Sequence, residues 1–243
     1  MLKQRIKVFK DYKPIIADPI FWIFTKKEII WMIIFIIIAS FISFIPLIPN
    51  DDPIKIFSTL LIFSLIIIST TAIKKLSAYH YAIKIEHSDW KLIRWWWYTR
   101  AHFKIPFPLG LIVPFFLAIF TIGYLKPFSF LQFDAENIEE VRILKKHGPR
   151  GSRRKELINE NDLSYTAATG FYMLLFLAFV GLLLKPYFPF FGYSLTKYSI
   201  YFGFWNLLPI SQLDGTKIFF GTTLLWSFLI IIFSILSLLI LLI

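Results

Sequence analysis

The residues with the clearest chemical potential lie near the C-terminus, in the stretch NLLPISQLDG. Asn206 offers an amide, Pro209 removes a backbone donor and interrupts a helix, and Gly215 permits a tight change of direction. Asp214 is the only carboxylate after residue 162, in surroundings that are mostly apolar. Such a carboxylate can bind a cation, pair with a basic side chain or cap the beginning of a helix. The residues alone leave a functional role and a capping role equally open.

The composition is that of a polytopic membrane protein. Of the 243 residues, 57% are hydrophobic and 19% are aromatic, and the mean hydropathy is +0.68. The chain has no cysteine, which excludes thiolate metal sites and cysteine nucleophiles. We assign the net charge of +11 to loops that face the cytoplasm and anionic lipid headgroups. We expect no nucleic-acid partner, because the chain has no aromatic-basic recognition motif.

The apolar stretches predict an all-α membrane fold, a helical bundle of about five to six spans, since a span needs about 20 apolar residues. Residues 1–28 form a cytoplasmic N-terminal segment, and 29–243 form a single transmembrane domain. Spans are predicted at 29–48, 56–73, 163–184, 198–213 and 218–243, with a segment at 107–133 that either spans or is re-entrant, and a basic loop at 134–162.

The basic residues predict the orientation of these spans. Seven Lys or Arg occur in 1–28 and seven more in 74–106, so both regions are expected on the cytoplasmic side of the cell membrane. A full crossing by 107–133 would place the loop 134–162, with another seven basic residues, outside. We therefore expect 107–133 to be re-entrant, which requires that protein or a cavity shields its backbone.

The spacing of Asn206, Pro209, Asp214 and Gly215 resembles the N-x-x-P-x-x-x-L-D-G motif of the site-2 protease family of intramembrane zinc metalloproteases. In that family the Asp is the third zinc ligand, and the Asn is thought to help bind the substrate or the developing oxyanion. The other two ligands are the His residues of an H-E-x-x-H motif on an earlier span, and its Glu is the general base. Three ligands leave one position open for an activated water.

The H-E-x-x-H motif is missing from this chain. In the corresponding segment, TTAIKKLSAYH, Lys74 and Lys75 stand at the positions of the first His and the Glu, and Ala78 stands at the second His. A second family motif, S-x-A-G-P-x-x-N, is reduced to LSYTAATGFYM, without the Pro and the Asn. The resemblance therefore predicts a site-2-protease-like core without catalysis or cofactor, a pseudoprotease that binds transmembrane segments of partner proteins.

Two other functions remain open. In one, the protein is an active intramembrane zinc metalloendopeptidase in which His80, Glu86 and His87 join Asp214 as ligands. A regular helix would separate the two histidines by about 10 Å, so this site needs a kink. Without it, they lie on an interfacial amphipathic helix. In the other, the protein is a small transporter with Asp214 as a coupling site. The sequence shows no internal repeat and indicates no second buried acid, which argues against a transporter.

The lysines suggest how the site could be stable without a metal. If Lys74 or Lys75 occupies the place of a zinc ligand or the base, its ammonium can pair with Asp214 and replace the positive charge of the metal. Our hypothesis is that this ion pair joins the span 56–73 to the span 198–213. Removal of one partner would then leave a costly unpaired charge.

Overall fold

The computed structural model describes residues 24–44, 53–81, 83–94, 102–123, 126–128, 131–137 and 159–242. The helices are α2 (Lys26–Ser43), α3 (Pro53–His80), α4 (Leu109–Phe120), α6 (Glu160–Leu184), α7 (Pro189–Leu207), α8 (Asp214–Gly221) and α9 (Thr223–Leu242). The strands are β1 (Ile83–Asp89), β2 (Lys91–Arg94), β3 (His102–Pro108) and β4 (Leu131–Asn137).

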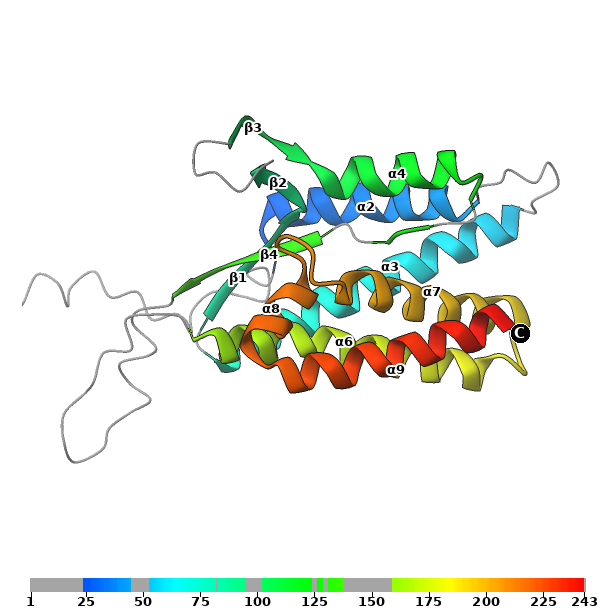
Figure 1. Cartoon of the computed structure of the whole chain (residues 1–243). Helices are drawn as coiled ribbons and strands as arrows, with labels where there is room; N and C mark the ends of the chain where they lie inside the picture. Colours follow the sequence, from blue (N-terminus) through cyan, green and yellow to red (C-terminus); the bar gives the residue numbers. More distant parts are fainter. Residues whose placement is uncertain are drawn as a thin grey trace, which may run out of the picture.

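The long helices α2, α3, α6, α7 and α9 run alongside one another in a bundle (Figure 1). The strands and α8 gather at one end of this bundle, where α2 and α6 begin and α3 and α7 end (Figure 1). The C-terminus lies at the opposite end. Residues far apart in the sequence therefore meet at the strand end of the bundle.

The structure is mostly helical, as predicted, but the described residues contain fewer candidate membrane spans than the five to six expected. Within the described residues three helices, α3, α6 and α9, are long and apolar enough to cross a membrane. The helix α2 begins with three charged residues, and α7 contains Lys197 and Asn206, so neither is uniformly apolar. The helix α7 ends at Leu207, six residues before the end of the predicted span 198–213. The predicted span 218–243 is divided into the short helix α8 and the apolar helix α9.

The segment after α3 is extended, so the predicted amphipathic helix through His80 and His87 is wrong. The helix ends at His80, and Ile83 begins a strand whose inward side chains, Ile85 and His87 among them, alternate with the exposed Lys84. This alternation has the period of two that a half-buried strand requires. The all-α class is corrected accordingly, because β1 pairs with β4 and β2 with β3 in two antiparallel sheets.

The chain between residues 108 and 131 connects the end of β3 to the beginning of β4, and these two ends lie close together. Pro108 of β3 lies opposite Lys91 of β2, and Leu131 of β4 lies opposite Asp89 of β1. Because one residue separates Asp89 from Lys91, the two ends of the connecting segment are neighbours. We call residues 108–131 the hairpin segment. Its helix α4 has 12 residues, a length of about 18 Å, whereas the hydrocarbon core is about 30 Å thick.

The hairpin segment reverses direction after α4. Ile122 and Gly123 have φ angles of 51° and 77°, which turn the backbone out of the helix. Lys126 then donates from Nζ to the carbonyl oxygen of Ser43, the last residue of α2, at 2.8 Å. The carbonyl groups at a helix C-terminus attract a cation, so α2 provides an acceptor for the basic residue in this bend.

Two predicted cytoplasmic regions lie largely outside the described residues. These are 1–23 of the N-terminal segment and 138–158 of the basic loop.

The motif stretch NLLPISQLDG forms the break between α7 and α8. Leu208, which precedes Pro209, has an extended backbone with φ −61° and ψ 131°, the conformation favoured before proline. Gly215 of α8 then packs directly against the end of α7, since a Cβ at this position would lie 2.2 Å from the carbonyl oxygen of Leu207. The glycine of the motif is therefore required by a contact between two backbones.

We expect Gly215→Ala to lower the stability of the protein, because the backbone of Leu207 cannot move aside as a flexible side chain can. The expected loss is about 1–3 kcal/mol, typical of overpacking, and thermal unfolding of the purified protein in detergent measures it. Thr216→Ala adds no atom at the next position and is the matched control. Equal unfolding midpoints for the two variants would contradict the backbone contact.

Candidate functional site

Two buried side chains of opposite charge meet between α3 and α8. Nζ of Lys74 donates to Oδ2 of Asp214, and the two side chains are 8% and 3% exposed. Asp214 is the first residue of α8, yet its Oδ1 has no hydrogen-bond partner in the described part of the chain, and its Oδ2 bonds to the lysine. Asp214 therefore takes part in an ion pair instead of capping the helix. Of the two lysines predicted as partners of Asp214, Lys74 forms the ion pair, and the pair joins α3 to α8 and not to the helix α7 of the predicted span 198–213.

The neighbouring helix α6 leaves room for the lysine. A Cβ at Gly170 would lie 2.3 Å from Cε of Lys74, so the small residue allows the aliphatic part of the lysine to pass between α3 and α6. Ala78, one turn after Lys74, is buried on the same face of α3. The two positions aligned with the zinc-binding histidines thus both face the interior of the bundle.

Lys75 binds a different acid, Glu28, which is part of the predicted N-terminal segment. Its Nζ lies 2.5 Å from Oε2 of Glu28, a residue that is 1% exposed. The same oxygen accepts a hydrogen bond from the backbone N–H of Thr25 at 2.7 Å, and the Thr25 hydroxyl accepts from the Glu28 N–H. This is a capping box at the beginning of α2. In the sequence, the threonine three residues before Glu28 could have indicated this capping box.

His87 joins the same acid from β1. Its backbone N–H donates to Oε1 of Glu28 at 2.7 Å, and its Nδ1 lies 3.4 Å from that oxygen. The imidazole is 2% exposed. Burial lowers the pKa of His87, although the hydrogen bond to Glu28 raises it. His87 is therefore neutral at pH 7.

We call Glu28, Lys74, Lys75, His87 and Asp214 the charged cluster. Its two lysines and two carboxylates form two ion pairs, so the charges compensate one another within the bundle. The cluster joins the beginning of α2, the end of α3, the strand β1 and the beginning of α8. Glu28 is a second buried acid, contrary to the expectation that Asp214 is alone.

The alternative zinc ligands are not brought together. His80 is exposed at the end of α3, and Glu86 lies 3.2 Å from Lys84 on the outward side of β1. His87, next to Glu86 in the chain, is directed inward to Glu28. In the portion of the chain that the structure describes, no three His, Asp or Glu side chains are grouped so that they could hold a metal ion.

Asn206 of the motif binds backbone groups of the protein itself. Its Nδ2 donates to the carbonyl oxygens of Phe128 and Phe202 at 2.9 and 2.8 Å. Phe128 belongs to the returning part of the hairpin segment, so Asn206 holds that part against α7. Both N–H donors of the amide are used in these bonds.

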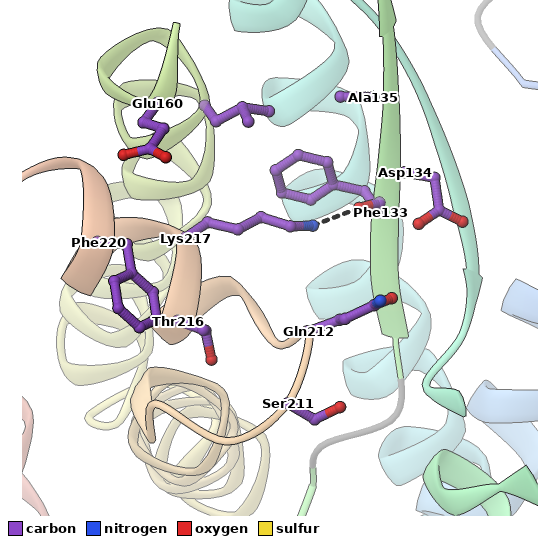
Figure 2. Close-up of a pocket in the computed structure, with 10 residues that line it drawn as sticks. Phe133, Asp134, Ala135, Glu160, Ser211, Gln212, Thr216, Lys217 and Phe220 are labelled. Carbon is purple, nitrogen blue, oxygen red and sulfur yellow. Dashed lines mark hydrogen bonds between the residues drawn. The ribbon is translucent and has the colours of Figure 1, made fainter. Parts of the chain in front are cut away.

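A groove of about 420 Å³ lies between β4, the beginning of α6 and the helix α8. Lys217, one turn after Asp214, extends along this groove, and its Nζ donates to the carbonyl oxygen of Phe133 on β4 (Figure 2). Leu163 and Phe220 add apolar surface, and Gln212 adds an amide. The motif did not indicate Lys217 as a site residue, although a lysine three residues after Asp214 in an apolar stretch is a usable signal.

Asp89 is a further buried acid at the end of β1. It is 0% exposed, and neither carboxylate oxygen has a hydrogen-bond partner among the described residues. Burial raises the pKa of Asp89 from an ordinary value of 3.8 to about 6, although nearby Lys91 lowers it. This acid lies where the two ends of the hairpin segment meet.

Comparisons with protein-family models, with curated proteins and with solved structures give no match to this chain. The resemblance to site-2 proteases therefore rests on residues 206–215 and on the order of the elements before them.

We expect Asp214→Asn to lower the stability of the protein by about 3–5 kcal/mol, because it leaves the buried ammonium of Lys74 without a counter-charge. Lys74→Gln should be destabilising for the same reason. The double variant should be more stable than the sum of the single losses predicts, by about 0.5–3 kcal/mol of coupling. Thermal unfolding of the four proteins measures this cycle.

Lys75→Gln is the matched control for this cycle, because Lys75 binds Glu28 and not Asp214. It should not rescue Asp214→Asn. Rescue by Lys75→Gln, or strict additivity of Lys74→Gln with Asp214→Asn, would contradict the pairing.

Asp89→Asn should stabilise the protein at pH 7.5. The pKa of Asp89 is higher in the folded than in the unfolded chain, so the folded state binds more protons between these values. The stability of the natural protein therefore falls as the pH rises from about 4 to about 6. Across pH 4–8, the unfolding midpoint of the variant should exceed that of the natural protein above pH 6, and this difference should disappear towards pH 4.

Proposed function

We propose that the protein is a multi-pass membrane protein built on the plan of the site-2 proteases, and that it binds transmembrane segments of partner proteins without cutting them. The observation that carries the proposal is the ion pair of Lys74 with Asp214. Lys74 stands at the position aligned with the first zinc ligand, and Asp214 stands at the position aligned with the third.

The chemistry of these side chains supports binding over hydrolysis. The ammonium of Lys74 supplies the positive charge that Asp214 requires, but it has no open coordination position at which a water could be activated. Ala78 offers no ligand, and Lys75, aligned with the general base, is a cation bound to Glu28. The residues at the four aligned positions therefore stabilise the bundle and provide no hydrolytic group.

The proposed orientation in the cell membrane places the strand end of the bundle on the cytoplasmic side. This agrees with the basic residues of 1–28 and 134–162. The hairpin segment then enters and leaves on the cytoplasmic side as a re-entrant segment, with α4 packed against α2. The C-terminus, at the other end of the bundle (Figure 1), is then outside.

The groove beside α8 supports a binding role. It lies at the strand end, where a partner helix that leaves the membrane would continue as an extended chain. Its walls combine apolar side chains with amide and ammonium groups, as ligand sites in proteins commonly do.

We expect the purified protein to contain no stoichiometric zinc and to leave a transmembrane reporter peptide uncut, because Lys74, Lys75 and Ala78 replace the catalytic set. The same reporter, with a photo-reactive residue and in lipid nanodiscs, should nevertheless crosslink to the protein. Metal analysis, a cleavage assay and a crosslinking assay measure these outcomes.

Asp214→Asn is the discriminating variant in these assays. About one zinc per chain together with cleavage that Asp214→Asn abolishes would replace our proposal with an active endopeptidase. Ion flux in liposomes that depends on Asp214, without crosslinking, would replace it with a transporter.

A further inference from the structure

Lys217 is a cation in the groove that forms no salt bridge among the described residues. Its Nζ bonds to the carbonyl oxygen of Phe133 and lies 3.3 Å from the centroid of the Phe133 ring. The nearest acid in the chain, Asp214, is already bound by Lys74. Lys217 is partly buried, and an ammonium withdrawn from water without a salt bridge is costly. Burial lowers the pKa of Lys217 to about 8, although the nearby carboxylates of Asp214 and Asp134 raise it.

The ammonium also has unused hydrogen-bonding capacity. A lysine has three N–H donors, and one of them is bound to Phe133 in the described part of the molecule. Lys217 can therefore bind a ligand and keep its bond to β4. A carboxylate is the acceptor that gives the strongest bond to an ammonium.

The two acids on the walls of the groove do not fill this place. Asp134 accepts a hydrogen bond from the hydroxyl of Ser88 on β1, and Figure 2 shows its carboxylate directed away from Lys217. Glu160 is exposed in the first turn of α6. The groove has two acids and one base among its lining residues, but its ammonium lies apart from both carboxylates and is complementary to a negatively charged group of a ligand.

We propose that Lys217 recognises a carboxylate on an extended peptide segment of the partner, bound in the groove between β4 and α8. The apolar walls formed by Leu163 and Phe220 and the amide of Gln212 fit a peptide chain with mixed side chains. This inference rests on the proposed function and specifies the chemistry of the partner, an acidic residue next to its transmembrane segment.

The test uses the full-length protein in nanodiscs and two fluorescent octapeptide libraries. The libraries are identical except for a fixed central Glu in one and a fixed central Gln in the other. We expect the Glu library to bind at least tenfold more tightly, and fluorescence anisotropy measures the difference. Lys217→Met should abolish the preference for Glu, and Lys217→Arg should keep it. Lys185→Met, at an exposed lysine after α6, should leave it unchanged.

A second measurement follows Lys217 in the unaltered protein. Acetylation of its amine by an activated ester, detected by mass spectrometry, should be slowed by the Glu library and not by the Gln library. Oleate supplies the same carboxylate on a lipid, so protection by oleate without protection by the Glu library would overturn the peptide ligand.

The outcomes separate this inference from the proposed function. Equal binding of both libraries overturns the role of Lys217 and leaves partner binding intact. No binding of either library, together with no crosslinking of the transmembrane reporter, overturns both.

Discussion

Charge that is buried in an apolar bundle must be paired, and this requirement connects the parts of the structure. Lys74 and Lys75 are consecutive on α3 and diverge to two acids, Asp214 on α8 and Glu28 on α2. His87 brings β1 to the second acid. The beginning of one helix, the end of another, a strand and a short helix are thus joined to one another by a few charged atoms.

The sequence predicted the parts of the site that depend on local patterns. Asp214 stood out because charge is rare in its surroundings, and the motif alignment indicated Lys74 or Lys75 as its partner without deciding between them. The sequence could not predict Glu28 as part of the site, because an acid beside two lysines at the start of a helix is usually solvated. It also could not predict that His87 faces inward, because the alternating polar and apolar residues of β1 also fit one face of an amphipathic helix. Pairing between distant strands, such as β1 with β4, leaves no local signal in a single sequence.

The residues of the motif have structural roles in this fold that do not depend on the chemistry implied by the resemblance. Asn206 holds the hairpin segment, Gly215 lets α8 approach α7, and Asp214 neutralises a lysine. Each depends on a contact that a substitution would break. These contacts give each residue a role in the fold, so the presence of the motif alone does not establish an active enzyme.

The shared attachment of the hairpin segment has a mechanical consequence. Both of its ends are held by strands that meet at Trp90, between Asp89 and Lys91. The two arms of the hairpin segment belong to different sheets, since α4 follows β3 and the returning part leads into β4, so a rotation of β1 relative to β2 about this residue would move one arm relative to the other. Asn206 and Lys126 bind the returning part to α7 and α2, and these two hydrogen bonds oppose such a movement.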